Sequence, residues 1–269
     1  MKRCRVIVRG GGDIATGVAH KLKRCGMEVV VLESEKPTSI RRKVSFSEAV
    51  YKKESLVEGI KGVLVSSSKE AIEESKDNKI PVLIDPDGRS IKELKPHVVV
   101  DAIIAKKNLG TNINMAPLVI ALGPGFTAGK DCHVVVETMR GHDLGRLIYG
   151  GEALANTGNP GSIGGYSVER VIHSPADGLL KTLKNIGDIV SKGETIAIVG
   201  ETNVKSQISG VLRGILPEGI IIKKGLKMAD VDPRNNQVKN CYTISDKARC
   251  IGGAVVEAIM AEFSVWKNS

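Results

Sequence analysis

The sequence predicts an α/β protein: a Rossmann-like domain with a mostly parallel sheet, followed by a small β domain and a C-terminal helix. Apolar runs typical of buried strands alternate with charged helical patterns in the first half of the 269 residues, which favours a parallel sheet. A glycine turn follows the first strand, and an internal repeat marks the second half. The expected segments are 1–150 for the sheet domain, 151–166 for a linker, 167–235 for the β domain and 236–269 for a segment whose helix packs back on the first domain.

The composition is typical of a soluble globular protein, with 42% hydrophobic residues and a mean hydropathy of −0.02. No apolar run is long enough to span a membrane and no signal peptide is evident, so we expect a cytoplasmic protein without membrane contact. The net charge of +9 comes with only 3% aromatic residues, which favours a small anionic ligand over nucleic acid. The five cysteines form no Cys-x-x-Cys pair, so we expect reduced thiols and predict no metal site. The oligomeric state, including a homo-oligomer, stays open.

The first 33 residues have the pattern of a strand, a glycine turn, a helix and a second strand. In a dinucleotide fold such glycines let a pyrophosphate approach the helix N-terminus, and an acid at the end of the second strand accepts from a ribose hydroxyl. Asp13 is discordant, because an acid in this turn repels phosphate unless it caps the helix or binds a ribose or metal. The alternative is that the glycines only allow tight packing between strand and helix. The candidate cofactor-binding residues here are Gly10, Gly11, Gly12, Asp13, Ala15 and Glu33.

Residues 117–146 contain two further apolar strands, PLVIAL and HVVVE, and each ends in a loop rich in glycine and reactive side chains. Ligands of open α/β sheets bind beyond the carboxyl ends of the strands. Arginines there would hold a phosphate or carboxylate, and Glu137 and His142 would transfer protons. The alternative is that the glycines serve turns and the charges are solvated. The candidate catalytic residues are Glu137, Arg140, His142 and Arg146, and the candidate cofactor-binding residues are Gly123 and Gly125.

Two other polar segments could reach the same site. Asp101 ends an apolar strand and is followed by a basic loop that contains Lys106, Lys107, Asn108 and Thr111. The segment 230–234, DVDPR, is expected on a loop, where paired surface charges are an equally good interpretation.

The β domain carries an internal repeat in which Gly178, Gly187 and Gly193 recur 32 positions later. The stretch GDIVSKGETIAIV resembles the barrel-sandwich hybrid of biotinyl and lipoyl carrier domains. In those carriers a lysine on the hairpin between the two halves bears the cofactor. Asn203 stands at that position and has no amine to acylate, and Lys205 lies in an expected strand. We therefore expect a scaffold or a ligand lid and no swinging arm.

Several longer stretches resemble one family, the accessory proteins of selenium-dependent molybdenum hydroxylase systems (the YqeB group). They include RGGGDIATGVAHKL, VDAIIAKKNLGT, LGPGFTAGKD, ETMRGHDLGRLIYGG, ANTGNPG, DVDPR and ISDKAR, and they extend over nearly the whole chain. The resemblance implies a role in making, loading or selenylating the molybdenum cofactor. It does not mark Cys132 as a thiol that handles selenium.

The leading hypothesis is an accessory protein in the maturation of such a hydroxylase, which binds a phosphate-bearing ligand and contacts the apo-hydroxylase. The ligand would be molybdopterin or a nucleotide of the NAD(P), ATP or CTP type. One alternative is an NAD(P)-dependent oxidoreductase, which explains the glycine turn and leaves the repeat without a purpose. The other is a non-enzymatic adaptor that binds the hydroxylase through its basic surface. Whether the protein is an enzyme stays open.

Overall fold

The computed structural model describes residues 4–158 and 161–263, and the chain divides into two compact units. Unit 1 comprises Met1–Pro37, Ser45–Thr157 and Ile244–Ser269, and unit 2 comprises Thr38–Val44 and Gly158–Thr243. Both units are therefore assembled from segments that lie far apart in the sequence. None of the helices in the described part of the chain is long and apolar enough to cross a membrane.

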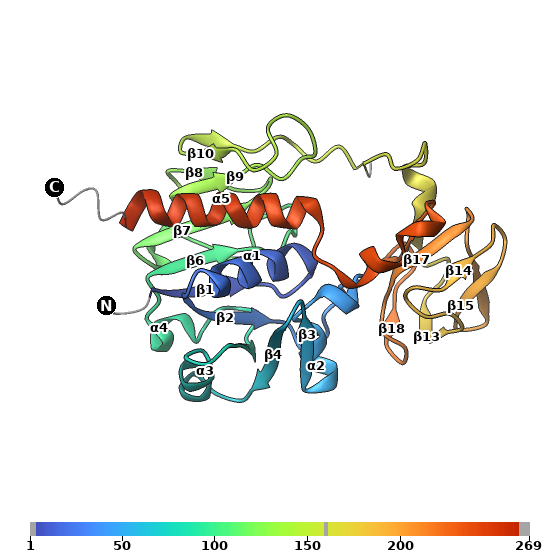
Figure 1. Cartoon of the computed structure of the whole chain (residues 1–269), viewed down its shortest axis with the longest axis horizontal. Coiled ribbons are helices and arrows are strands. Elements are labelled where there is room, and N and C mark those ends of the chain that lie inside the picture. Colours follow the sequence, from blue (N-terminus) through green and yellow to red (C-terminus); the bar gives the residue numbers. More distant parts are fainter. Residues whose placement is uncertain (1–3, 159–160, 264–269) are drawn as a thin grey trace. The chain divides into compact units, whose positions relative to one another are not determined.

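Unit 1 is built on a nine-stranded sheet with the order β10-β9-β7-β6-β1-β2-β5-β4-β3 (Figure 1). Seven strands run parallel to one another: β1 (Arg5–Arg9), β2 (Glu28–Glu33), β4 (Ile60–Val65), β5 (Lys79–Ile84), β6 (Val98–Asp101), β7 (Leu118–Leu122) and β9 (Val134–Val136). The edge strands β3 (Glu54–Val57) and β10 (Leu147–Ile148) pair antiparallel. The central strands are rich in valine and isoleucine and are buried, as expected for a sheet covered on both faces.

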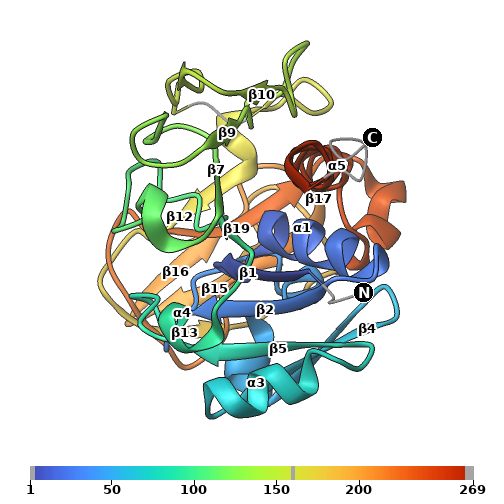
Figure 2. The same ribbon diagram turned by 90° about the vertical axis from the view of Figure 1, so that its left-hand side faces the viewer.

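Helices cover both faces of this sheet. Helices α3 (Ser68–Glu74) and α4 (Ile91–Leu94) contribute to one buried cluster, while α1 (Asp13–Arg24) and α5 (Asp246–Phe263) lie side by side (Figures 1 and 2). The approach of α1 to α5 depends on small residues, because a Cβ on Gly17 would lie 2.6 Å from the Cβ of Ala248. Helix α5 contacts α1 along this stretch. The remaining elements of unit 1 are α2 (Glu48–Lys52), β8 (Thr127–Ala128), β11 (Gly151–Glu152) and the 3-10 turn η2 (Ile113–Met115).

Unit 2 contains two four-stranded sheets, β12-β19-β17-β14 and β16-β15-β13-β18, in which all neighbouring strands are antiparallel. The strands are β12 (Val171–His173), β13 (Gly178–Thr182), β14 (Ile189–Val190), β15 (Thr195–Val199), β16 (Thr202–Lys205), β17 (Gly210–Ile215), β18 (Ile221–Ile222) and β19 (Lys227–Asp232). The 3-10 turns are η1 (Arg42–Val44), η3 (Val168–Arg170) and η4 (Asn235–Tyr242). Strands β13, β14 and β15 begin 32 positions before β17, β18 and β19 (210 − 178, 221 − 189, 227 − 195).

The predicted fold class is wrong. The large sheet is mixed, and unit 2 consists of two separate antiparallel sheets, so the chain is not a Rossmann-like domain followed by a barrel-sandwich hybrid. The connections from β6 to β7 and from β7 to β9 contain no α-helix, and α5 from the end of the chain packs beside β7 and β9. Glycine turns and strand repeats are local signals, whereas the pairing of edge strands and the source of the covering helices depend on contacts between distant residues.

Candidate functional site

Four parallel strands of unit 1, β1, β6, β7 and β9, end at the same edge of the sheet. The segments 10–13, 101–111, 123–125 and 137–146 follow these strand ends, and residues 245–247 at the start of α5 lie beside them. We call these five segments the loop edge. Most of the candidate residues from the sequence lie here, as expected for the place where α/β sheets bind ligands.

The glycine turn at the end of β1 is tightly enclosed. Gly10 has a φ of +95°, and a Cβ there would lie 3.0 Å from the carbonyl oxygen of Ala102, so only glycine fits. The N–H of Gly11 donates to Glu33 Oε2 at 2.7 Å, and the N–H of Ser47 donates to the carbonyl of Gly11 at 2.9 Å. The backbone of residue 47 therefore lies directly against the turn.

Glu33, the predicted ribose acceptor, is already engaged. One carboxylate oxygen accepts from Gly11, and the other accepts from the backbone N–H of Ser34 at 2.7 Å. The carboxylate thus fixes the glycine turn to the end of β2. The ribose role of Glu33 stays a prediction, and it requires that these hydrogen bonds be exchanged for a ligand.

Helix α1 begins beyond the turn with Gly12 as its N-cap, which forms no side-chain cap hydrogen bond. Asp13 is the acidic residue of the first turn and Ala15 is buried. The first N–H groups of a helix have no partner within the helix, and the dipole favours an anion beside them. Asp13 supplies one negative charge at this end, and its expected repulsion of a phosphate is not removed by the N-cap, which is Gly12.

A buried charge network organises the loop after β6. Arg9 and Asp101 are each 1% exposed, and Arg9 Nη1 lies 3.7 Å from Asp101 Oδ2. Thr111 links the pair, since its hydroxyl accepts from Arg9 and donates to Asp101 at 2.6 Å. Asn108 in turn accepts from the N–H of Thr111 and donates to its carbonyl, each at 2.8 Å. Burial raises the pKa of Asp101, against the lowering effect of Thr111 and Arg9.

The same loop contains two non-glycine residues in the left-handed region, Ile104 with a φ of +58° and Lys106 with a φ of +61°. This conformation is rare for a β-branched residue and concentrates at functional segments. Gly125 supports the loop from β7, because a Cβ there would lie 2.7 Å from the Cα of Lys107. Gly123 packs similarly on the side chain of Thr138. Both glycines therefore allow close contact between neighbouring loops. The side chains of Lys106 and Lys107 are exposed.

Glu137 is 2% exposed, and both of its carboxylate oxygens accept backbone hydrogen bonds. The N–H of Met139 donates to Oε1 at 2.7 Å and the N–H of Leu154 donates to Oε2 at 2.8 Å. The side chain thus ties the loop after β9 to the segment near residue 154. Proton transfer by Glu137 stays a prediction, and it requires that one of these amides be released.

The predicted cations of the loop after β9 differ in their surroundings. Arg140 donates two hydrogen bonds of 2.8 Å to Asp246, which raises the pKa of its guanidinium. Arg146 forms an exposed ion pair of 2.9 Å with Asp143, and His142 is exposed. Arg140 is therefore tied to the start of α5, whereas His142 and Arg146 face solvent.

Lys247, in the first turn of α5, is not among the candidate residues from the sequence. Burial lowers its pKa, and Arg140 adds to the lowering, while Asp13 and Glu137 oppose it. The charge of Lys106, in the loop after β6, also lowers the pKa of Lys247. Charged residues of three segments of the loop edge, 10–13, 101–111 and 137–146, therefore influence this lysine. The sequence does contain an indication of Lys247. A lysine in the first turn of a helix is disfavoured by the helix dipole, so its presence there suggests a role other than helix stabilisation.

Three further residues that the sequence brought into question, Asp230, Asp232 and Cys132, lie outside the loop edge. Asp230 and Asp232 belong to strand β19 of unit 2 and are buried, so the expectation that they lie on a loop is wrong. Each is paired with arginine, Asp230 with Arg170 at 3.1 Å and Asp232 with Arg234 at 2.7 Å. Cys132 is fully buried, and burial followed by the charge of Asp131 raises its pKa to about 11. Such a thiol stays protonated near neutral pH and is a poor nucleophile.

Comparison with known proteins gives one informative relative. The chain is 50% identical over 255 residues to Uncharacterized protein YqeB of Escherichia coli (strain K12), an alignment that covers 95% of this chain and 47% of YqeB. The chain thus spans about half the length of this relative. This similarity supports the resemblance to the YqeB group and carries no activity with it. No protein-family model matches the chain.

Solved structures resemble the chain only weakly. The ectoine utilization protein EutE (DoeB) from Ruegeria pomeroyi matches with a TM-score of 0.26 and 11% identity over 85% of each chain. An aspartoacylase family protein from Mesorhizobium loti matches with a TM-score of 0.27 and 10% identity over 86% of this chain and 85% of that one. Scores this low define no shared fold or activity.

Proposed function

We propose that the chain binds a phosphate-bearing ligand at the loop edge and thereby assists the maturation of a selenium-dependent molybdenum hydroxylase. The observation that supports the ligand site is the place of Lys247 in the chain: it is half-buried in the first turn of α5 and directly follows Asp246, which pairs with Arg140 at 2.8 Å. Burial and then the charge of Arg140 lower the pKa of this lysine. The maturation role rests on the sequence resemblance, in particular on the stretch ETMRGHDLGR.

Two kinds of group at this edge suit a phosphate. Lys247 and Lys106 supply positive charge, and the first turn of α1 supplies N–H groups beyond the enclosed glycine turn. Molybdopterin and nucleotides of the ATP or CTP type both carry the phosphate that such a site would hold. Arg146 and His142 are exposed beside it and are the proposed second contacts, with Glu137 and Arg140 in supporting positions.

The alternative of an NAD(P)-dependent oxidoreductase is less well supported. A dinucleotide needs an open glycine turn and a free acid at the end of β2. Here the backbone of Ser47 lies against Gly11, and both oxygens of Glu33 accept backbone N–H groups. We therefore expect no change in NADH fluorescence on addition of the protein.

The proposal is tested by replacing Lys247 with alanine and measuring ligand retention and hydroxylase maturation. Lys247→Ala should lose the bound ligand and fail to support activation of the apo-hydroxylase. The control is Lys92→Ala, which removes an exposed lysine of α4 and the same charge. Full ligand retention and activation by the Lys247→Ala protein would refute the proposed site.

A further inference from the structure

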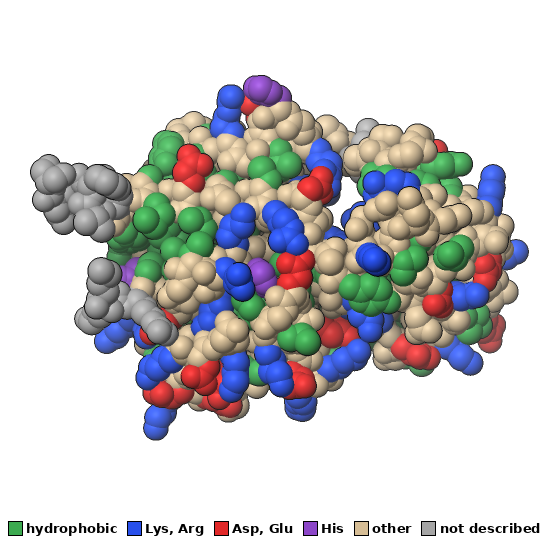
Figure 3. Space-filling model, viewed as in Figure 1, with side chains coloured by type: hydrophobic (Ala, Val, Ile, Leu, Met, Phe, Trp, Pro, Cys, Tyr) green, Lys and Arg blue, Asp and Glu red, His purple; other side chains and the backbone are tan. Residues whose placement is uncertain are grey.

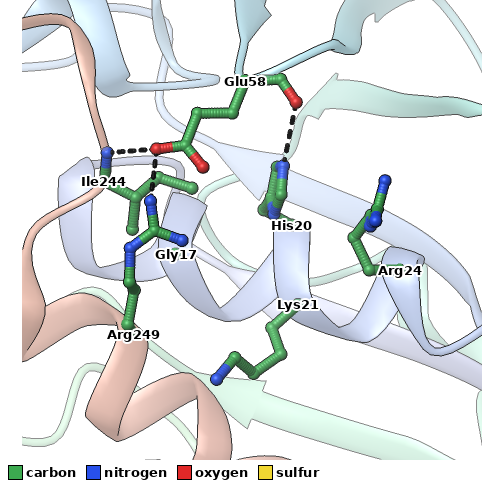
Figure 4. Close-up of a pocket in the computed structure, with 7 residues that line it drawn as sticks. All are labelled: Gly17, His20, Lys21, Arg24, Glu58, Ile244 and Arg249. Carbon is green, nitrogen blue, oxygen red and sulfur yellow. Dashed lines mark hydrogen bonds and ion pairs between the residues drawn. The ribbon is translucent and has the colours of Figure 1, made fainter.

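A second basic site lies in unit 1 between α1, α5 and the turn that joins β3 to β4 (Figure 4). It is an open groove of about 430 Å³. Its lining side chains are His20, Lys21 and Arg24 of α1, Arg249 of α5 and Glu58 of the turn. Gly17 and Ile244 complete the lining. None of these residues belongs to the loop edge.

The spacing along α1 explains why its cations share one groove. Gly17, Lys21 and Arg24 are separated by four and three positions, so they lie on one face of the helix. Figure 4 shows His20, Lys21 and Arg24 projecting from this stretch of α1, with Arg249 reaching in from α5. Figure 3 shows Lys and Arg side chains gathered over the region where these two helices lie side by side.

Glu58 is the acidic residue of this lining, and its carboxylate is already engaged. It accepts from the N–H of Ile244 at 2.8 Å and from the guanidinium of Arg249. Its backbone carbonyl lies 3.3 Å from His20 Nε2 (Figure 4). Within the part of the chain that the structure describes, Lys21 and Arg24 form no ion pair. The groove therefore keeps two cations whose charge is not balanced by a neighbouring acid.

The side chain of Lys21 lies beside two glycines of α5. A Cβ on Gly252 would lie 3.4 Å from the Cβ of Lys21, and a Cβ on Gly253 would lie 3.7 Å from its Nζ. The Lys21 side chain thus lies beside a part of α5 that has no side chains.

We propose that this groove binds a small molecule that carries a diphosphate or a phosphate monoester. Its volume falls in the range of small-ligand sites, about 300–1,000 Å³. A guanidinium supplies two parallel donors to phosphate oxygens, and an ammonium supplies a point charge. Arg24 and Lys21 provide one of each, one helical turn apart, and the imidazole of His20 lines the groove beside them.

The test uses inorganic pyrophosphate as the probe, calorimetry as the readout and the full chain as the protein. The double variant Lys21→Ala/Arg24→Ala should bind one molar equivalent of pyrophosphate less than the wild type, or should bind pyrophosphate in the groove at least about tenfold more weakly. The reason is that two charge-assisted contacts are lost. The matched control Lys69→Ala/Lys92→Ala removes two exposed lysines of α3 and α4 and should bind as the wild type does. Circular dichroism checks that each variant is folded.

A second readout locates the anion. The imidazole resonances of His20, assigned with His20→Gln, should shift on addition of pyrophosphate to the wild type and not to Lys21→Ala/Arg24→Ala. The proposal is overturned if the double variant binds pyrophosphate with the same isotherm as the wild type. It is also overturned if Lys69→Ala/Lys92→Ala loses as much pyrophosphate binding as Lys21→Ala/Arg24→Ala. Lys247→Ala separates the two sites, because it should remove pyrophosphate from the loop edge and leave the His20 shift intact.

Discussion

Arg140 donates two hydrogen bonds of 2.8 Å to the carboxylate of Asp246, a residue 106 positions further along the chain. The pair joins the loop after β9 to the first turn of α5. An acidic residue in that turn is favoured by the helix dipole, and the bidentate geometry fixes its orientation. Lys247 follows Asp246 directly, so this pair determines where the lysine sits at the loop edge.

Replacing Arg140 with alanine should raise the pKa of Lys247. The lysine pKa is lowered by burial and then by the charge of Arg140, so removal of the arginine leaves the ammonium form better stabilised. The titration of the Lys247 side chain, followed by NMR, measures this shift. Arg146→Ala is the matched control, because it removes an exposed arginine of the same loop. An unchanged Lys247 titration in Arg140→Ala would contradict the described arrangement.

Replacing Asp101 with asparagine should strongly destabilise unit 1. The change leaves the guanidinium of Arg9 buried without its counter-charge, and removal of one partner of a buried pair costs about 3–5 kcal/mol. Urea unfolding measures the loss in the free energy of unfolding. Asp87→Asn breaks an exposed pair with Arg89 and should change the free energy by no more than about 0.5 kcal/mol. Equal effects of the two variants would show that the Arg9 network is not structural.

Glu58 should make the stability of the protein depend on pH in the acidic range. Burial opposes the ionised form, but hydrogen bonds from Arg249 and Ile244 outweigh it and hold the pKa of this carboxyl below its usual range. A lowered folded-state pKa contributes stability above the unfolded-state pKa, and this stability is lost as the pH falls through the folded-state pKa. Glu58→Gln should therefore lower Tm near neutral pH and flatten its acid dependence, as followed by thermal unfolding at a series of pH values.

The control for that measurement lies in the same hairpin. Glu54 forms an exposed pair with Lys61, so Glu54→Gln should leave the acid dependence close to that of the wild type. If Glu58→Gln and Glu54→Gln show the same dependence of Tm on pH, Glu58 does not hold α5 to the turn between β3 and β4 in the way the structure indicates.

Two glycines in the α1–α5 contact should respond to alanine in opposite directions. A Cβ on Gly17 would lie 2.6 Å from the Cβ of Ala248, so Gly17→Ala should cost about 1–3 kcal/mol of unfolding free energy through overpacking. For Gly253 the nearest atom would be 3.7 Å away, and alanine in a helix interior stabilises by up to about 1 kcal/mol. Chemical denaturation of both variants measures the difference. Destabilisation by Gly253→Ala equal to that by Gly17→Ala would contradict the packing.

The sequence was a good guide to local structure and a poor one to assembly. The glycine turn, α1 and β2 lie where the patterns placed them, because strand and helix periodicities are encoded in neighbouring residues. The prediction of the fold class was wrong because the pairing of the edge strands β3 and β10 depends on long-range contacts. Side-chain partners were also hidden: no spacing rule shows that Arg140 is paired with Asp246, or that Glu33 accepts from Gly11.

Ligand binding at the loop edge is tested by a native mass spectrum with elemental analysis. The protein would be purified without oxygen from cells supplied with molybdate and selenite, as wild type, Lys247→Ala and Lys92→Ala. We expect the wild type and Lys92→Ala to carry molybdopterin or its nucleotide form, with molybdenum or selenium present, and Lys247→Ala to lose it. A nicotinamide dinucleotide in its place, or an equal bound mass in Lys247→Ala, would contradict the account.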